Sequence, residues 1–405
     1  MRSVIIITQS YPYGHGESFL EEELRVMSEN NIKVVVVPLK IHGTTRSLPP
    51  LVEVVSVSVS FSWVRALSSW PLLRIFLSEL LLRPVSWHPN AFRLLLFFIK
   101  SAYVVCSKLR QHQESGHWPE APILYSYWLG GLTYGALLFR GKGLSPKVVS
   151  RAHGGDIYQE RWCPRYLPAL RFVFKKVDQV YVVSKDGAEY LKKRFPLSAK
   201  CIQVSYMGTS DPGFLATRSE DGVCRLVSCA FIVPVKRLEM LMDALILLRT
   251  TYPSFRFHWT HLGGGPGFDG LTSKCHSLIA DGCCSLLGSI SNAEVIEFYR
   301  NHPVDLFVSV SSSEGLPVSM MEAISVGIPI LATDVGGVTE IVKQSSGFLM
   351  PADATLNDIV SSIIRFSGQC KGSDRQQIRE AWKSMFSSDS NVIELLSSFR
   401  KMIIH

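Results

Sequence analysis

Residues 305–323 read DLFVSVSSSEGLPVSMMEA, and this stretch decides the fold class of the chain. Its apolar start predicts a strand, the small polar residues after it predict a loop, and Pro317 suits the first turn of a helix. The backbone N–H groups of Leu316, Val318 and Ser319 would be free at that helix start, where the helix dipole favours an anion such as phosphate. The stretch therefore predicts a strand–loop–helix unit with a ligand site at the carboxyl end of the strand.

Two glutamates in this stretch are candidates for ligand contacts. Glu314 lies in the loop, where open α/β sheets bind ligands, and could accept hydrogen bonds from the hydroxyls of a sugar ring. Glu322 lies further along the helix and could accept from the vicinal hydroxyls of a ribose. Taken singly, each has a structural alternative, Glu314 as the helix cap and Glu322 as a solvated helix residue.

Short β-branched runs alternate with helical patterns along the whole chain, which predicts an α/β fold with parallel sheets. In the first half, strands are expected at 3–8, 33–38, 52–59, 122–126, 147–152, 179–183 and 202–205. In the second half, strands are expected at 225–230, 255–261, 284–288, 305–310 and 328–332. A helix is expected over 18–30, with Ser18 as its cap and Glu21 reaching back in a capping box.

The length of 405 residues favours two domains over a single core. We expect a first doubly wound domain over 1–207, a linker over 208–223, a second doubly wound domain over 224–385, and a C-terminal helix over 386–405 that packs back on the first domain. The linker is assigned because turn formers and polar residues concentrate there without an apolar period. The two domains would face each other across a cleft.

Composition excludes several classes of protein. Hydrophobic residues make up 47% and charged residues 19% of the chain, which is too apolar for a disordered protein. The nine cysteines are scattered and contain no C-x-x-C pair, so we expect reduced thiols in a cytosolic protein and no zinc site. No secretory leader is expected, and the longest apolar stretch, 94–106, is shorter than the roughly 20 residues of a membrane-spanning helix.

The net charge of +8 is unevenly distributed, because residues 61–112 carry seven Arg or Lys residues and a single acid, Glu79. Two apolar helical stretches, 63–83 and 92–100, lie within this segment. Their tryptophans and cations are Trp63, Trp70, Trp87, Arg65, Arg74, Arg83, Arg93 and Lys100. This composition is typical of interfacial helices, which would dock peripherally on an anionic membrane. The alternative is that the apolar faces only pack on the sheet of the first domain.

The pattern Glu-x7-Glu within SEGLPVSMMEA (313–323) is followed by GIPILATDVGGVTEIV (327–342) and SGFL (346–349). Together these motifs resemble the retaining group 1 (family 4) glycosyltransferases. The resemblance extends through SCAFIVPVKR (228–237), WTHLGGGP (259–266), LLGSI (286–290), RAHGGDIY (151–158) and YPYGHGESF (11–19). It covers both halves of the chain and is stronger in the second. It implies the GT-B fold, two Rossmann-like domains of which the first binds the acceptor and the second a nucleotide-sugar donor.

Three catalytic residues are implied by this resemblance: Glu314, His153 and Lys236. Glu314 would contact the transferred sugar, and Lys236 would neutralise the phosphate leaving group, a role that suits an ammonium. His153 would face the donor sugar across the cleft. The alternative for His153 is an ordinary hydrogen-bonded histidine at a strand end.

The resemblance also implies a donor-binding set in the second domain. Its members are Glu322, Arg237, Gly315, Leu316, Pro317, Val318, Gly288 and Gly264. Glu322 would hold the ribose, and the amides after Gly315 would hold the diphosphate. Family members usually carry an Arg five residues before the position of Lys236, where this chain has Phe231. Whether Arg237 replaces that missing cation stays open.

In the first domain, the resemblance implies an acceptor or phosphate loop that contains Gly14, Gly16 and Glu17. Gly14 would let the backbone approach a diphosphate or an acceptor closely, since glycine has no Cβ. The alternative for Gly14 is an ordinary turn glycine.

The mechanism that the family implies is transfer with retention and without an enzymatic nucleophile, in which the leaving phosphate assists deprotonation of the acceptor hydroxyl. The donor would be a UDP- or GDP-sugar. No cofactor and no metal are expected, because the chain lacks the Asp-x-Asp motif of metal-dependent transferases. The acceptor would be a saccharide or lipid-linked saccharide of capsule, exopolysaccharide or O-antigen synthesis, reached from the inner face of the cytoplasmic membrane.

Other functions are weaker matches to the sequence. Gly265, Gly267 and Gly270 match the dinucleotide pattern G-x-G-x-x-G, but no acid follows about 20 residues later as a dehydrogenase requires. A glycoside hydrolase needs two carboxylates that face each other across a bond. Binding of nucleic acid is not expected, because no recognised motif is present. The alternative that remains is a GT-B-shaped nucleotide-sugar epimerase or hydrolase without a saccharide acceptor.

Overall fold

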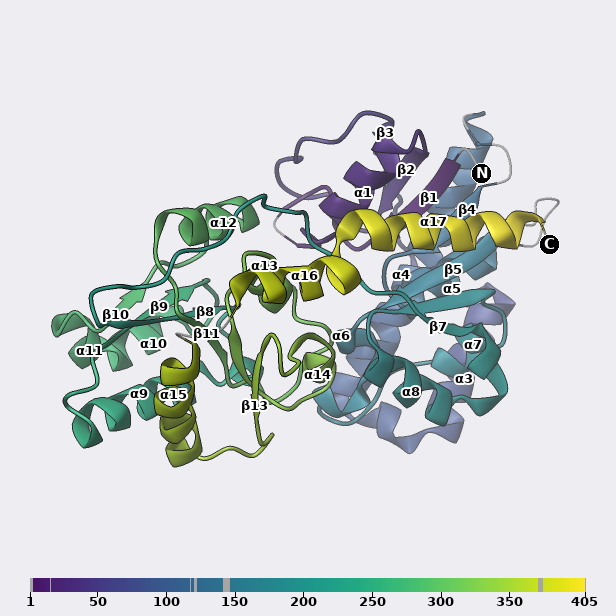
Figure 1. The fold of residues 1–405 in the computed structure, drawn as a ribbon. Coiled ribbons are helices and arrows are strands. Elements are labelled where there is room, and N and C mark those ends of the chain that lie inside the picture. The colour runs from purple at the N-terminus through teal and green to yellow at the C-terminus, as the bar shows by residue number, and fades with distance from the viewer. Residues whose placement is uncertain are drawn as a thin grey trace. The chain divides into compact units, whose positions relative to one another are not determined.

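The computed structural model describes residues 3–14, 16–116, 118–119, 122–140, 146–370 and 374–404 (Figure 1). The chain divides into two compact units: unit 1 comprises Met1–Tyr206 and Ser388–His405, and unit 2 comprises Met207–Ser387. Each unit is a parallel sheet covered by helices, which confirms the predicted α/β fold. Among the described residues, the helices are all too short or too polar to cross a bilayer.

Unit 1 is built on a parallel sheet with the strand order β3-β2-β1-β4-β5-β6-β7. The strands are β1 (Ser3–Thr8), β2 (Lys33–Pro38), β3 (Val52–Val54), β4 (Ile123–Ser126), β5 (Lys147–Ala152), β6 (Gln179–Val182) and β7 (Ile202–Val204). The helices are α1 (Leu20–Glu29), α2 (Trp63–Leu67), α3 (Trp70–Leu82), η1 (Pro84–Trp87), α4 (Pro89–Glu114), α5 (Gly131–Phe139), α6 (Gly154–Ile157), η2 (Gln159–Arg161), α7 (Leu170–Phe174), α8 (Lys185–Arg194), η3 (Pro196–Cys201) and α17 (Ser388–Ile404).

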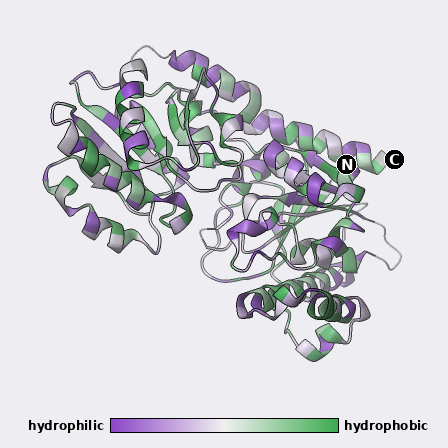
Figure 2. Cartoon of the chain, turned by 90° about the horizontal axis from the view of Figure 1, so that it is seen from below, coloured by the Kyte–Doolittle hydropathy of each residue, from purple (hydrophilic) through white to green (hydrophobic). Residues whose placement is uncertain are grey.

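Both faces of this sheet are covered, which is why β1 is buried at every position and apolar at its four central ones. Side chains alternate along β1: Ile5 and Ile7 join one core cluster, and Val4 and Ile6 join another on the opposite face. The strands are accordingly mostly green in Figure 2, while helices mix polar and apolar residues. The alternation along β1 thus requires a helical layer on each side.

Unit 2 is built on a parallel sheet with the strand order β10-β9-β8-β11-β12-β13. The strands are β8 (Cys224–Cys229), β9 (Phe257–Leu262), β10 (Cys284–Leu286), β11 (Leu306–Ser309), β12 (Ile330–Thr333) and β13 (Gly347–Met350). The helices are η4 (Pro234–Lys236), α9 (Leu238–Thr251), α10 (Phe268–Lys274), α11 (His276–Ala280), α12 (Asn292–Asn301), α13 (Val318–Ser325), α14 (Val338–Ile341), α15 (Leu356–Cys370) and α16 (Arg375–Phe386).

The segment 208–223, expected as a linker, is bonded to the rest of unit 2. The N–H of Ala216 donates to the carbonyl of Val326 over 2.9 Å, and the N–H of Ser219 donates to a carboxylate oxygen of Asp305 over 3.1 Å. Trp382 donates from its indole N–H to the hydroxyl of Thr209 over 2.9 Å. These contacts explain why unit 2 begins at Met207.

The prediction that Ser18 caps the first helix is wrong. Helix α1 begins at Leu20, and its N-cap residue Phe19 has no side-chain cap bond. The N–H of Leu20 bonds instead to the carbonyl of Glu17, which has a positive φ of 57°, and Glu21 accepts from Arg46 over 2.7 Å. The helix start is therefore set by the backbone turn at Glu17 rather than by a capping box.

Two strands also differ from expectation. The strand expected over 52–59 is shorter in the structure and ends at Val54. Among the described residues of this stretch, only one further residue bonds to β2: the N–H of Val55 donates to the carbonyl of Val36. The edge strand β13 is additional, and its residues Gly347–Met350 pair with β12 in parallel. Its four residues lie between the turn at Ser346 and Pro351. A run of four residues is too short for the alternating pattern of a strand to be recognised in the sequence.

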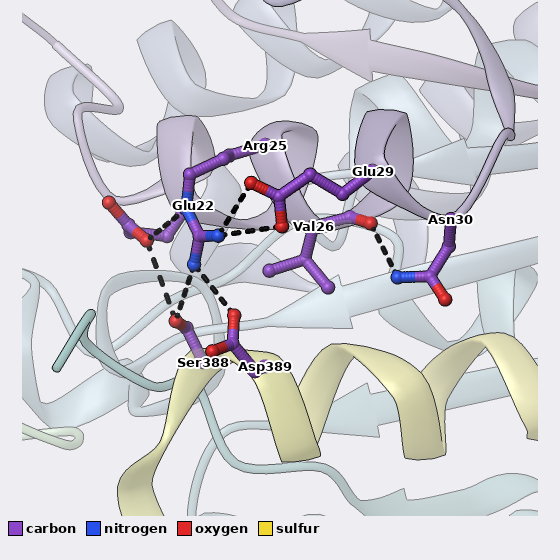
Figure 3. A network of polar contacts seen from close by, with 7 residues as sticks. All are labelled: Glu22, Arg25, Val26, Glu29, Asn30, Ser388 and Asp389. Carbon is purple, nitrogen blue, oxygen red and sulfur yellow. Dashed lines mark hydrogen bonds and ion pairs between the residues drawn. The ribbon is translucent and has the colours of Figure 1, made fainter.

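Helix α17 closes one face of the unit 1 sheet, beside α1 (Figure 1). Phe399 is fully buried, and its ring centroid lies 5.4 Å from that of Tyr125 and 5.7 Å from that of Tyr181. At the other end of the helix, Arg25 of α1 donates to Asp389 over 2.7 Å, within the network that Figure 3 shows. The helix is therefore held by an apolar contact in the core and by an ionic contact at the surface.

We expect these two contacts to differ in how much they contribute to the free energy of unfolding. Phe399→Ala should lower the free energy of unfolding by about 3–5 kcal/mol, because it leaves a cavity between two buried tyrosines. Asp389→Ala should lower it by only about 0.2–1 kcal/mol, because the ion pair is largely exposed. Urea unfolding of both variants beside the wild type measures the difference. Equal unfolding midpoints for Phe399→Ala and the wild type would show that α17 does not complete the core.

Candidate functional site

The strand order of unit 2 creates a point at which successive connections leave in opposite directions. From β8 the chain moves outward through β9 to β10, and it then returns to β11 on the other side of β8. The strand pairs are parallel, so the carboxyl ends of β8 and β11 lie at the same edge of the sheet. Open α/β sheets bind ligands at such a switch point.

Lys236 and Glu314 flank this switch point and contact each other. Lys236 ends η4, after β8, and Glu314 lies in the loop after β11. The ammonium nitrogen lies 2.6 Å from Oε1 of Glu314, with 23% of the Lys236 side chain and 9% of the Glu314 side chain exposed. The two residues predicted to carry catalysis in the second domain are thus brought together by the fold.

The loop that carries Glu314 is held by hydrogen bonds on one side and by close backbone packing on the other. The guanidinium of Arg237 donates to the carbonyls of Val310 and Ser311 over 2.5 and 2.9 Å. On the other side, Gly336 has a φ of +53°, and a Cβ there would lie 2.1 Å from the carbonyl oxygen of Glu314. Arg237 therefore holds the loop, while Phe231, at the position where the resemblance leads us to expect an Arg, is 58% exposed.

Glu322 lies on α13 and is 6% exposed. Its Oε1 accepts a hydrogen bond from the side-chain amide of Asn292, at the start of α12, over 2.7 Å. Pro317 is the N-cap residue of α13, and Gly315 and Leu316 lie just before it. Val318 and the residue after it open the helix, where helical geometry leaves N–H groups without an intrahelical acceptor. The structure therefore places a buried carboxylate on the helix whose start follows Glu314.

The predicted glycines Gly264 and Gly288 allow close contact between the loops after β9 and β10. A Cβ on Gly264 would lie 2.3 Å from Oγ of Ser289, and the N–H of Gly263 bonds to the carbonyl of Gly288 over 2.9 Å. A Cβ on Gly265 would lie 2.8 Å from the backbone nitrogen of Ile232. Close packing against Ile232 thus accounts for Gly265 of the dinucleotide-like pattern, whereas a Cβ on Gly270 would meet no atom within 4 Å.

Unit 1 has its own switch point, between β1 and β4. Glu17, in the loop after β1, accepts from the backbone N–H groups of Gln9, Ser10 and Tyr11, each over 2.8 Å. It also accepts from the indole N–H of Trp128, which follows β4, over 2.6 Å. The carboxylate of Glu17 therefore joins the two loops at this point.

The glycines of the first loop differ in their surroundings. Gly14 has a φ of +68°, and a Cβ there would meet no atom within 4 Å. A Cβ on Gly16 would lie 3.3 Å from Oγ of Ser10. Arg46 donates to the carbonyls of Gly14 and Gly16, each over 2.8 Å. A Cβ would thus meet no neighbour at Gly14, although Gly16 is the more solvent-exposed of the two glycines.

His153 follows β5 and lies in an aromatic cage. Its ring centroid is 4.6 Å from that of Trp128, 5.3 Å from that of Tyr127 and 5.4 Å from that of Phe19. Within the described residues, neither ring nitrogen has a hydrogen-bond partner, although both are buried. Burial, assisted by the charge of Arg151, lowers the pKa of His153 to about 3. The imidazole is therefore neutral at physiological pH. Among the described residues, none forms a hydrogen bond with either of its nitrogens.

Asp156 holds the backbone beside this histidine. Its two carboxylate oxygens accept from the N–H of His153 over 2.6 Å and from the N–H of Leu129 over 2.7 Å. Burial raises the pKa of Asp156 to about 8, although the two backbone bonds act in the opposite direction. Asp156 thus links the loops after β4 and β5.

Several residues with a positioning role are not identified by the sequence analysis. Trp128, Asn292 and Gly336 hold Glu17, Glu322 and the backbone of Glu314, respectively. All three lie shortly after an expected strand, and Gly336 also lies within the stretch 327–342 that carries the resemblance. Among the described residues, no three His, Cys, Asp or Glu side chains gather where they could hold a metal ion.

Residues 219–384 match the family model of glycosyl transferases group 1. The matched stretch lies within unit 2 and contains Lys236, Glu314 and Glu322. The O-antigen biosynthesis glycosyltransferase WbnH of Escherichia coli is 31% identical over 172 residues, which are 42% of this chain and 43% of the relative. The chain spans about half the length of the curated relatives it matches.

Two solved structures share the fold along nearly the whole chain. The apo form of the lipopolysaccharide outer core galactosyltransferase WaaB has a TM-score of 0.67 at 17% identity and covers 98% of this chain and 99% of that chain. Alr3699/HepE of Anabaena in complex with UDP has a TM-score of 0.65 at 15% identity and covers 98% of this chain and 100% of that chain. The likeness establishes the GT-B fold, with two Rossmann-like domains, as the sequence predicts.

The environment of His153 predicts a specific loss of stability in acid. The unfolded chain binds a proton on this histidine near pH 6.5, whereas the folded chain binds it only near pH 3, so acidification between these values favours unfolding. The free energy of unfolding should fall by about 2 kcal/mol between pH 7 and pH 5 through this group alone. His153→Gln should remove that part of the pH dependence, as urea unfolding at both pH values would measure.

His261 provides the internal control for this experiment. Burial also lowers its pKa, to about 4, so its contribution to acid sensitivity should persist in His153→Gln. An unchanged pH dependence in the variant would mean that His153 is protonated as readily in the folded chain as in the unfolded chain.

Proposed function

We propose that this protein is a glycosyltransferase that moves a sugar, with retention, from a nucleotide-diphosphate sugar to a hydroxyl of a saccharide acceptor in the synthesis of a surface polysaccharide. The observation that carries the proposal is the contact between Lys236 and Glu314 at the switch point of the group 1 domain. A cation beside a carboxylate provides one group for a leaving diphosphate and one for a sugar hydroxyl. The names of WbnH and WaaB support surface polysaccharide as the product class.

We propose that the donor is held by unit 2. Lys236 stabilises the negative charge that develops on the leaving diphosphate, and Glu314 orients the transferred sugar. Glu322 accepts from the ribose hydroxyls, in exchange for or beside its bond from Asn292. The amides at the start of α13 bind the diphosphate. The solved complex of HepE with UDP supports a uridine nucleotide as the first donor to test.

The proposed chemistry needs orientation and charge stabilisation more than an acid or base of the protein. The bond from the sugar to the leaving phosphate breaks while the acceptor oxygen attacks the same face, and the leaving phosphate takes the acceptor's proton. Lys236 makes that departure easier, because a preorganised cation stabilises the developing charge. No metal or cofactor forms part of the proposal.

Substitutions at the donor site should separate binding from transfer. Glu314→Gln should lower the transfer rate by about 10²–10³, because it removes a preorganised contact to the sugar. It should leave UDP affinity unchanged or higher, since Lys236 loses its internal anionic partner. Lys236→Met and Glu322→Gln should weaken UDP binding and transfer together. Calorimetric titration with UDP and a radiolabelled transfer assay measure the two quantities.

Two results would contradict these assignments. Near-normal turnover in Lys236→Met would remove Lys236 from the site, and loss of UDP binding in Glu314→Gln would place Glu314 on the nucleotide rather than on the sugar. Incubation with the donor alone provides a further control, because an epimerase or hydrolase would convert the donor without any acceptor.

We also propose that the acceptor is lipid-linked and that unit 1 docks on the inner face of the cytoplasmic membrane. The support is the apolar surface of α2, α3 and η1. Its exposed members include Val64, Trp70, Leu81, Leu82 and Trp87, of which Trp70 is 68%, Leu81 73% and Trp87 72% exposed. Arg65, Arg74 and Arg93 are exposed in and beside these elements. Buried residues such as Leu72 and Ile75 pack on the core, so the exposed set is additional to the packing face.

Vesicle co-sedimentation tests this docking. We expect binding to anionic liposomes that weakens with salt, because each surface cation contributes about 1 kcal/mol near an anionic leaflet. Arg74→Glu/Arg93→Glu and Leu81→Ser/Leu82→Ser should each reduce binding. The matched control is Lys192→Glu/Lys193→Glu on α8, which makes the same change in net charge elsewhere on unit 1. Equal recovery in the supernatant with and without anionic lipid would refute the docking.

A further inference from the structure

A cavity of about 540 Å³ lies in unit 1, and none of its lining residues belongs to the candidate functional site. It lies at the carboxyl end of β2, between residues 39–42, residues 58–61 and one side of α4. Phe97, Lys100, Ser101, Val104 and Lys108 line it from α4. Their spacing of three or four residues places them on one face of that helix.

The charge of this cavity is entirely positive. Lys40, Lys100 and Lys108 line it together with His42, and none of the lining residues is acidic. Within the described part of the chain, no carboxylate forms an ion pair with any of these three lysines. Three ammonium groups around one cavity repel one another, and an anion inside it would relieve that repulsion.

Each lysine is held by neutral groups. The ammonium of Lys40 lies 6.0 Å from the ring centroid of Phe97, and that of Lys100 lies 5.6 Å from the ring centroid of Phe61. Lys108 is 3% exposed and donates to the carbonyl of Pro38 over 2.6 Å. Burial lowers the pKa of Lys108 to about 8, which shows the cost of a buried cation without a compensating charge.

The cavity also has an apolar side that continues to the membrane-docking surface proposed above. Phe61 lines the cavity, and its ring centroid lies 4.7 Å from that of Trp63 in an edge-to-face contact. Trp63 begins α2, the first helix of that surface. A ligand with an anionic head and a hydrocarbon tail would therefore find both partners here.

We propose that this cavity binds the phosphate or diphosphate group of a lipid-linked acceptor, with Lys40, Lys100 and Lys108 around the anion and the first part of the lipid against Phe61 and Trp63. The inference rests on the proposed function, because it supplies the binding site of the acceptor's lipid carrier. It differs from the donor site, which lies in unit 2.

Prenyl diphosphate probes test this site on the full chain. Farnesyl diphosphate should bind in calorimetric titration, inorganic diphosphate should bind more weakly, and farnesol should not bind. Lys40→Met/Lys100→Met should weaken farnesyl diphosphate binding by about tenfold or more, since two charge-assisted contacts are lost. Both lysines are exposed, so this variant should fold. The control is Lys192→Met/Lys193→Met, which should bind like the wild type.

UDP distinguishes failure of the site from failure of the proposed function. Saturating UDP should not displace farnesyl diphosphate, and Lys40→Met/Lys100→Met should bind UDP like the wild type. Equal farnesyl diphosphate affinity in that variant and the wild type, or displacement by UDP, would overturn the site. Inorganic diphosphate that binds as tightly as farnesyl diphosphate would overturn the lipid-linked ligand in favour of a free anion. Absence of UDP binding with an intact prenyl diphosphate site would instead overturn the donor assignment alone.

Discussion

The ion pair between Lys236 and Glu314 is the contact on which the arrangement of the candidate donor site depends. It joins the loops after β8 and β11, the two strands between which the unit 2 sheet changes direction. An arriving phosphate would offer Lys236 a second anionic partner, and Glu314 could then accept from a hydroxyl instead. The same contact thus keeps both groups in position in the free chain and leaves both available for exchange.

Several residues around this pair keep it in position and do not point to a ligand themselves. Arg237 donates to loop carbonyls, and Gly336 is small enough for the backbone of Glu314 to lie against it. Unit 1 repeats the principle at its own switch point, where Glu17 and Trp128 join the loops after β1 and β4. In both units, then, the side chain of a glutamate helps to join the two loops that diverge from the centre of the sheet.

The parts of this fold that can be predicted from the sequence are those set by residues close together in the chain. The stretch 305–323 forms β11 and α13 as expected, because its apolar run, polar loop and proline each act over a few residues. Ser18 does not cap α1, since Glu17 is held by Trp128, which lies 111 residues away in the sequence. The partner of Glu322 is Asn292 on another helix, and no local pattern connects them. Contacts between distant segments therefore set the details of the site that the motifs alone leave open.

The return of α17 to unit 1 has a consequence for the order in which the protein is made. Unit 2 is continuous in the sequence and is inserted between the two segments of unit 1. During translation, the sheet face that carries Val4 and Ile6 must wait for Phe399 until all of unit 2 has been synthesised. At roughly 5–20 residues per second, that delay is on the order of ten seconds or more. For this time α1 can cover part of that sheet face, but the part that α17 will cover stays exposed on the nascent chain, where a ribosome-bound chaperone could bind it.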